Sequence, residues 1–381
     1  MKLRAISVAA ICFGMTGCTV NAPFDPSDVF GDLSGLIEGI QSGFENAIED
    51  PLRSKPFPIV FGGDSERVFY ATNLTDIRIK FSGPTNDVVL PGLLGPSNVY
   101  KFQNKQRELI RPLAPTHAIA GMATDGEFLA FLSITDIDED PRFAVVVSDL
   151  RGFGDRIIFQ PDDEANVAVF ELAIDSGRLA FQIVDFDSGL STLRVEDLRG
   201  AEPAREFDGD VSNVRLRGSR LAYVGETDAG SSEVILHDLA TGEATVIAPN
   251  VAGGVPYLFL TDNRVVWAER ISADLFRVRA HDLPSGTTFV WADAVAGALT
   301  GASDEFLLAE EFTDRFPDKP NRIAVVRYDA DGKRKKLDEF NADGFAGQSQ
   351  ILGGRAVWVK PDRRIAVQPL AGGDRKIFRP F

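Results

Sequence analysis

Short apolar runs alternate with Gly, Asp, Asn and Pro turns along residues 57–381, and no long stretch has a helical period. Alternation of apolar and polar residues is the period of a β-strand that buries one face. One phrase, a turn followed by an apolar strand, recurs as DGEFLAFL (125–132), DSGRLAFQ (175–182), GSRLAYV (218–224), DNRVVWA (262–268) and GGRAVWV (353–359). The pattern predicts an all-β protein built from repeats.

The large apolar residue near the end of this phrase sets the repeat length. It recurs at Tyr70, Phe131, Phe181, Tyr223, Trp267, Leu308 and Trp358, mostly at intervals of 41 to 50 residues. A second phrase, such as VILHDLATGE (234–243), predicts a third strand that enters a tight hairpin, and EATVIAP (243–249) predicts a fourth strand. One four-stranded sheet buries too little apolar surface alone, so the seven units predict a seven-bladed β-propeller. We expect the ring to close by packing of blades, because the last unit contains four strands of its own.

The segment GSRLAYV…VILHDLATGEATVI is similar to the last three strands of a blade in TolB-like and WD40-type propellers, and this similarity covers nearly all of 57–381. TolB-type repeats usually carry Trp-Ser-Pro-Asp-Gly before the second strand, and in this sequence only the turn of that motif is present. His237-Asp238 and His281-Asp282 stand where the WD40 Trp-Asp pair would be. The resemblance therefore implies a fold and carries over no partner.

The first repeat has two interpretations. If NVYKFQNKQRELIRPL (98–113) supplies its last two strands, residues 73–97 are an insertion, and the runs DIRIKF (76–81) and NDVVL (86–90) predict an extra hairpin. Alternatively, those two runs are the third and fourth strands themselves, and 92–113 is a long connection. The sequence does not decide between them.

Residues 1–17 have the organisation of an export signal, with Lys2 and Arg4 before a short apolar stretch. The four residues Met15-Thr16-Gly17-Cys18 resemble the bacterial lipobox, whose usual form is Leu-Ala/Ser-Gly/Ala-Cys. The resemblance implies cleavage before Cys18 and diacylation of Cys18, a stable membrane anchor. Because Thr19 rather than Asp follows, it also implies the outer membrane where the source has two. An ordinary secretory signal with an accidental cysteine is the alternative.

Residues 18–56 form a separate segment that we interpret as a tether. Gly31, Gly35, Gly39 and Gly43 recur every four residues beside an apolar row, which predicts an amphipathic helix over about 27–49. A row of small residues suits close helix–helix contact or a membrane-surface helix. Interspersed acidic residues, and the cost of glycine in a helix, favour a loose tether instead.

Charge and composition exclude several functions. The formal net charge is −16, with 40 basic and 56 acidic residues, which argues against a nucleic-acid partner and against a general binder of anionic surfaces. The other cysteine, Cys12, lies in the signal segment, so the mature chain has no disulfide. No catalytic motif such as G-x-S-x-G or H-E-x-x-H is present. His237 and His281 occupy equivalent repeat positions and are interpreted as structural, while His117 has no evident partner.

The loops between the second and third strands are acidic. Blade 2 carries Asp136, Asp138 and Asp140, and blade 3 carries Asp185 and Asp187. Alternate carboxylates in a turn suit Ca²⁺, which takes six to eight oxygen ligands. Solvated acidic loop tips are the alternative explanation.

A propeller without a catalytic motif, carried on a lipid anchor, favours a non-enzymatic binding platform for a protein or peptide in the cell envelope. The alternative function is a propeller enzyme or carbohydrate-binding protein that uses a Ca²⁺-type cation at the acidic loops. A row of arginines at the start of the second strand is interpreted as solvated or as bridging neighbouring blades. Its members are Arg178, Arg220, Arg264 and Arg355. Function is expected where the repeats differ.

Overall fold

The computed structural model describes 14 segments of the chain. They are residues 57–73, 76–79, 88–91, 97–111, 118–135, 142–152, 154–162, 167–185, 187–227, 231–251, 254–272, 275–312, 322–341 and 349–380. The predicted signal peptide, Cys18 and the predicted tether helix lie outside these residues.

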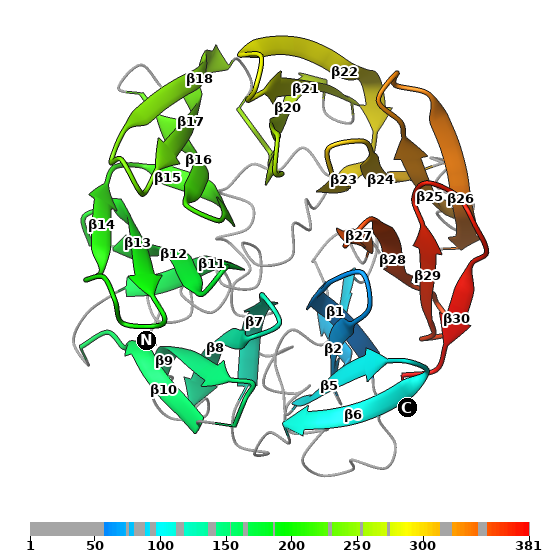
Figure 1. The fold of residues 1–381 in the computed structure, drawn as a ribbon, viewed down its shortest axis with the longest axis horizontal. Coiled ribbons are helices and arrows are strands. Elements are labelled where there is room, and N and C mark those ends of the chain that lie inside the picture. Colours follow the sequence, from blue (N-terminus) through cyan, green and yellow to red (C-terminus); the bar gives the residue numbers. More distant parts are fainter. Residues whose placement is uncertain are drawn as a thin grey trace. The chain divides into compact units, whose positions relative to one another are not determined.

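Seven four-stranded antiparallel sheets and one two-stranded sheet account for all the described strands (Figure 1). The chain is thus a seven-bladed β-propeller. We name the strands of a blade A to D in chain order, since they are hydrogen-bonded in that order in every blade. Blades 1 and 7 each contain four strands of their own, so the prediction that no strand is exchanged between the first and last blades is confirmed.

One compact unit comprises 1–169, 342–348 and 352–381, and holds blades 1 and 2 and most of blade 7. Blade 1 is β1 (Phe57–Gly63), β2 (Val68–Asn73), β5 (Ser97–Gln103) and β6 (Gln106–Arg111); blade 2 is β7 (Ala118–Thr124), β8 (Phe128–Thr135), β9 (Arg142–Asp149) and β10 (Gly154–Phe159); blade 7 is β27 (Ser349–Leu352), β28 (Arg355–Val359), β29 (Ile365–Pro369) and β30 (Lys376–Phe378).

The second unit comprises 170–341 and 349–351. Blade 3 is β11 (Val167–Asp175), β12 (Arg178–Asp185), β13 (Ser191–Asp197) and β14 (Arg205–Asp208); blade 4 is β15 (Val211–Arg217), β16 (Arg220–Glu226), β17 (Ser232–Asp238) and β18 (Ala244–Val251); blade 5 is β19 (Tyr257–Leu260), β20 (Arg264–Ser272), β21 (Leu275–Asp282) and β22 (Thr287–Ala296); blade 6 is β23 (Ala298–Ala302), β24 (Leu307–Phe312), β25 (Arg322–Tyr328) and β26 (Arg334–Asn341).

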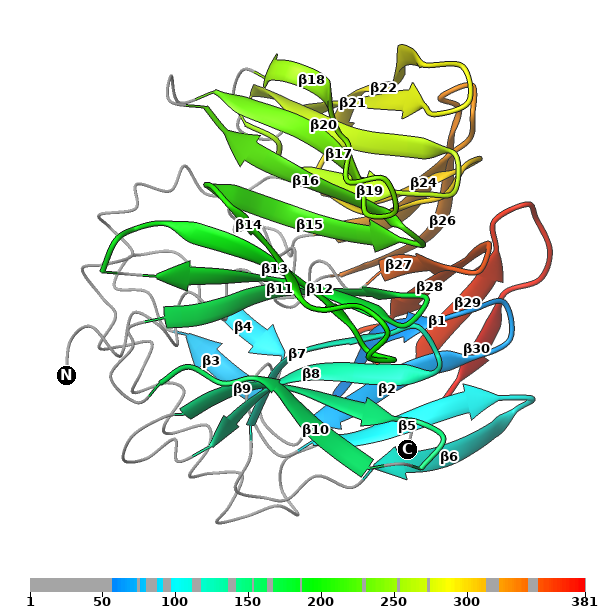
Figure 2. The same cartoon turned by 60° about the vertical axis from the view of Figure 1, so that its left-hand side comes forward.

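The insertion in blade 1 is an extra hairpin. Strands β3 (Asp76–Ile79) and β4 (Val88–Pro91) pair only with each other, whereas β2 pairs with β5. In Figure 2 the β3–β4 pair is drawn apart from the sheet of blade 1. The interpretation of 73–97 as an insertion is therefore correct, and the alternative assignment of its two runs as strands C and D is wrong.

The repeated phrase forms the A–B turn and strand B of each blade. All seven of its large apolar residues are buried, from 0% exposure at Tyr70 to 9% at Tyr223. Trp267 of blade 5 packs in one cluster with Val224 and Val234 of blade 4, so the side chain covers the face of the neighbouring sheet. The phrase recurs because each blade must bury its neighbour.

The aspartate that ends strand C, or directly follows it in blade 6, is a turn residue. In five blades its carboxylate accepts a backbone N–H two or three residues further on: Asp149 from Arg151, Asp197 from Arg199, Asp238 from Ala240, Asp282 from Ser285 and Asp329 from Asp331. An aspartate can replace a turn's backbone acceptor in this way. The Asp of the second phrase is thus explained by the C–D hairpin.

Candidate functional site

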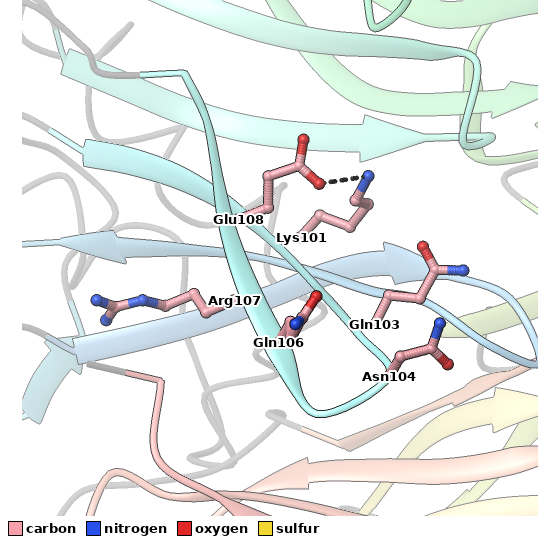
Figure 3. Close-up of a pocket in the computed structure, with 6 residues that line it drawn as sticks. All are labelled: Lys101, Gln103, Asn104, Gln106, Arg107 and Glu108. Carbon is pink, nitrogen blue, oxygen red and sulfur yellow. Dashed lines mark ion pairs between the residues drawn. The ribbon is translucent and has the colours of Figure 1, made fainter.

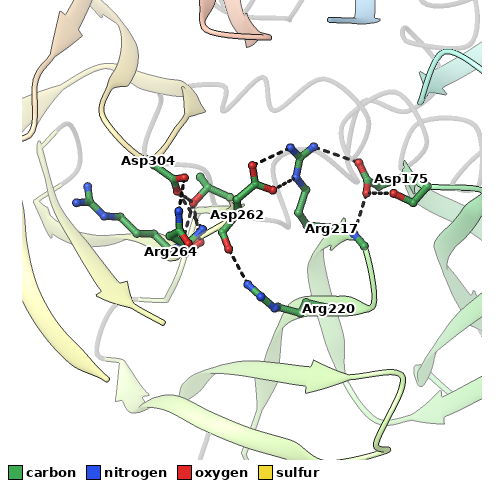
Figure 4. Close-up of polar contacts among 10 residues, drawn as sticks. Asp175, Arg217, Arg220, Asp262, Arg264 and Asp304 are labelled. Atoms are coloured by element: carbon green, nitrogen blue, oxygen red, sulfur yellow. Dashed lines mark hydrogen bonds and ion pairs between the residues drawn. The ribbon is translucent and has the colours of Figure 1, made fainter. Parts of the chain in front are cut away.

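The A–B turns of the second unit connect consecutive blades through charged groups (Figure 4). Asp175 of blade 3 accepts hydrogen bonds from the Gly218 amide at 2.7 Å and from Arg217 at 3.2 Å, both in blade 4. Arg217 also donates to the Asp262 carboxylate of blade 5, at 2.7 Å and 3.2 Å. One guanidinium therefore joins three blades.

The connection continues from blade 4 to blade 6. Arg220 donates to the Asp262 carbonyl oxygen at 2.7 Å. The carboxylate of Asp304, in blade 6, accepts from the backbone and side-chain amides of Asn263 at 3.0 Å and 2.8 Å. The hydrogen bond from Arg217 holds the pKa of the Asp262 carboxyl below its ordinary value of 3.8. These groups already satisfy one another, so this face has a structural role.

Two members of the arginine row bridge neighbouring blades as predicted, and two make contacts inside their own blade. Arg220 crosses to blade 5, and Arg355 of blade 7 donates to the carbonyls of Asp64 and Arg67 in blade 1, the second at 3.2 Å. Arg178 forms an ion pair with Glu202 at 3.3 Å inside blade 3. Arg264 lies over the Trp291 ring at 4.7 Å, a contact that the sequence did not indicate.

Blades 1 and 7 meet at what we call the closing seam. The rings of Phe378 and Phe102 stack with centroids 3.7 Å apart and planes 1° from parallel. The Pro380 carbonyl accepts from the Tyr70 hydroxyl at 2.9 Å and from Arg107 at 3.0 Å. The C-terminal residues thus fasten the last blade to the first without strand exchange.

The structure describes only part of the predicted cation site. Asp136, Asp138 and Asp140 lie outside the described residues, and so does His117. The Asp185 carboxylate accepts hydrogen bonds from the backbone amides of Asp187 and Ser188, at 2.8 Å and 3.3 Å. These bonds lower the pKa of the Asp185 carboxyl. Within the described segments, no group of three or more His, Cys, Asp or Glu is placed to hold a metal ion. Cation binding therefore stays a prediction.

Two histidines lie on strand C of neighbouring blades, as the repeat alignment predicted. His237 is buried and contacts the Phe207 ring edge to face, with centroids 4.7 Å apart. Burial, together with the nearby Arg205, lowers the pKa of His237 below its ordinary value of 6.5. His281 shares a hydrogen bond of 2.9 Å with Thr288. Both contacts are structural.

A polar recess of about 570 Å³ lies at the C–D hairpin of blade 1 (Figure 3). Its lining is Lys101, Gln103, Asn104, Gln106, Arg107 and Glu108. Lys101 and Glu108 form an ion pair of 2.7 Å, while Arg107 points away from that pair in Figure 3. Sequence reasoning missed this recess, although Asn104-Lys105 between two alternating runs indicates the two-residue turn, where both residues have positive φ (52° and 65°).

No protein-family model matches the sequence. No curated protein matches it either. Within the segments that the structure describes, no helix is both long and apolar enough to cross a bilayer.

Solved structures share the propeller fold at low sequence identity. A prolyl endopeptidase matches 94% of this chain and 56% of its own, with a TM-score of 0.57 and 14% identity. The β-propeller domain of the Trilobed protease from Pyrococcus furiosus, described as having an open velcro topology, matches 69% and 83%, with a TM-score of 0.51 and 15% identity. TolB from Acinetobacter baumannii matches 78% and 80% at 13% identity, but its TM-score of 0.41 supports no argument. The fold is therefore shared with peptidases, and the function has to be inferred from this chain's own residues.

Proposed function

We propose that this chain is an envelope lipoprotein whose propeller is a non-enzymatic binding platform for a protein or peptide. The observation that carries the proposal is the polar recess of blade 1, beside an exposed outer strand on a scaffold whose blades are joined by side-chain hydrogen bonds. Binding residues are commonly presented by loops and turns on such rigid scaffolds.

The chemistry of the recess suits a peptide. Gln103, Asn104 and Gln106 each supply an amide that can both donate and accept a hydrogen bond, as a peptide backbone requires. Gln103 already donates to Glu66 at 3.3 Å, which orients it. Lys101 and Glu108 add one charge of each sign, and the Arg107 guanidinium is engaged by the Pro380 carbonyl, so the recess favours a polar, uncharged segment.

A photo-reactive phenylalanine at Gln106 tests the platform in native envelopes. We expect a discrete crosslinked species from Gln106, because the side chain lines the recess. Thr241, on the corresponding C–D turn of blade 4, is the matched control and is expected to give none. Equal crosslinking from the two positions, or none from Gln106, would contradict the proposal.

The lipid anchor is tested separately by Cys18→Ser. Loss of the acylated side chain is expected to move the protein from the membrane fraction to the soluble fraction, since two acyl chains give stable anchoring. Persistence in the membrane fraction after a salt wash would overturn the lipoprotein assignment and leave the recess experiment unaffected.

A further inference from the structure

Strand pairing aligns one residue of every strand D with the buried large residue of strand B, and we call these seven positions the outer row. They are Leu109, Ile157, Glu206, Val246, Val290, Lys335 and Ile377. Five of them are apolar and exposed by 42% to 61%. Blades 3 and 6 depart from this pattern with a charged residue.

Blade 3 neutralises its outer-row charge. Glu206 lies opposite Arg194 of strand C, and the two form an ion pair of 3.0 Å. In blade 5 the arginine at the same strand C position, Arg279, pairs with Glu269 at 2.7 Å. In blades 3 and 5, arginine at this position is therefore matched by a carboxylate.

Blade 6 places two cations opposite each other. Lys335 of β26 pairs with Arg327 of β25, so both side chains stand on one face of the sheet. Arg327 lies over the Phe306 ring at 4.8 Å, and among the described residues neither it, Lys335 nor the exposed Lys333 forms an ion pair. Like charges directly opposite on adjacent strands are destabilising. An arrangement that weakens the isolated sheet is explained if an anion binds there.

The net charge of the chain gives no indication of this basic segment in blade 6. Residues 322–336 contain six basic and two acidic residues, in a chain whose net charge is −16. Two other cations in the segment are internally paired, Arg334 with Glu311 and Lys336 with Glu339, and Arg322 lies at the opposite end of β25 from Arg327. Arg327, Lys333 and Lys335 therefore form the available cationic surface, which we call the blade 6 edge.

We propose that the blade 6 edge docks on the anionic phospholipid headgroups of the membrane that holds the Cys18 anchor. This inference rests on the proposed function, because the Cys18 anchor is what places the chain at a membrane. The 38 residues between Cys18 and β1 could span up to ~130 Å if extended, so the anchor alone does not orient the propeller. A basic surface adds a second, electrostatic contact of the kind that peripheral proteins use with anionic lipids.

Vesicle sedimentation of the mature chain with Cys18→Ser tests the blade 6 edge in the absence of the acyl chains on Cys18. We expect binding to vesicles of phosphatidylcholine mixed with phosphatidylglycerol, weakened by added salt, and no binding to phosphatidylcholine alone. Lys333→Gln with Lys335→Gln should reduce the affinity roughly tenfold or more. Lys105→Gln with Lys376→Gln changes the charge equally at exposed sites on blades 1 and 7 and should have little effect.

Lys335→Glu separates binding from folding. This substitution places a glutamate opposite Arg327, as Glu206 lies opposite Arg194 in blade 3. The variant should therefore unfold at an equal or higher temperature, and it should lose vesicle binding. Absence of binding to anionic vesicles, equal loss in the control pair, or binding only to a soluble polyanion such as polyphosphate would overturn the membrane assignment. None of these outcomes bears on the crosslinking at Gln106 or the fractionation of Cys18→Ser.

Discussion

The closing seam of blades 1 and 7 is built differently from the seams between blades 3 to 6. Besides buried apolar packing, the latter have at their A–B turns exposed charged groups such as Arg217 and Asp262, whose side chains are 47% and 65% exposed. The closing seam uses stacked rings and hydrogen bonds to backbone carbonyls, and these hydrogen bonds join residues 273 to 310 positions apart. Loop-closure entropy grows with sequence separation. The seam that joins the two ends of the chain therefore has the more buried polar contacts.

The largest effect is expected from Gly353→Ala. A Cβ atom there would lie 2.1 Å from the Ser65 backbone nitrogen of blade 1, at a φ of +51°. We expect a loss of about 2–4 kcal/mol in the free energy of unfolding, measured by chemical denaturation, because neither backbone can move without opening the seam.

Gly354→Ala is the control in the same turn. Its φ is also positive, at +75°, but a Cβ there meets nothing within 4 Å. The loss should be only about 1 kcal/mol, the cost of the left-handed backbone. Similar losses for the two alanines would show that backbone strain, not the seam, explains the first.

The second largest effect is expected from Phe378→Ala. Removing the ring takes away the stack on Phe102 and a contact with Tyr70, whose centroid is 6.3 Å away. Because Phe378 is only half-buried, we expect about 2 kcal/mol, less than for a core phenylalanine. A double-mutant cycle with Phe102→Ala should give a coupling of about 1 kcal/mol. Ile377→Ala, at an exposed neighbouring position, should lose little, and an absent coupling would contradict the role of the stack.

Arg217→Gln tests the other kind of seam. It removes ion pairs to Asp175 and Asp262, but half-exposed pairs are screened by solvent, so the loss should be about 0.5–1 kcal/mol. The loss should shrink at high salt, which screens exposed charges. Phe378→Ala should show no such salt dependence. A loss as large as that of Phe378→Ala would remove the distinction between the two seams.

Strands A to D were predictable because burial imposes the alternating pattern, but the bulges in strand D were not recognised. Leu109-Ile110, Ile157-Ile158, Val246-Ile247 and Val290-Trp291 each place two apolar residues together, and pairing shows that the second is the extra residue of a β-bulge. A bulge turns the second side chain inward while the first stays exposed. The broken alternation was the available signal.

The polar sites were less predictable, because they join residues far apart in the chain. The bonds from Tyr70 and Arg107 to Pro380 depend on how blades 1 and 7 meet, which no local pattern encodes. The blade 6 edge was hidden for a different reason. That Lys335 stands where most blades have an apolar residue is seen only once strand pairing aligns the outer row. The net charge of −16 argued against a surface that binds anions.

The smallest effect is a pH dependence at Asp262. Its pKa is lowered in the folded state by the hydrogen bond from Arg217, so the carboxylate stabilises the fold above the ordinary value of 3.8. That stabilisation is lost as the pH falls through the lowered folded-state pKa. Asp262→Asn should therefore be less stable than the unmodified protein at neutral pH, by at most about 0.5 kcal/mol because the side chain is exposed, and the difference should vanish in acid.

The same substitution in an Arg217→Gln background shows which group is responsible. Because Arg217 is the main cause of the lowered pKa, Asp262→Asn should then have almost no pH-dependent effect on the denaturation midpoint. A full effect that persists without Arg217 would mean that Arg220, the other nearby cation, stabilises the carboxylate instead. The polar contact between blades 4 and 5 would then depend on Arg220 of strand B rather than on the A–B turn. Arg355 holds the equivalent position in the closing seam, so the two seams would be more alike than the comparison above states.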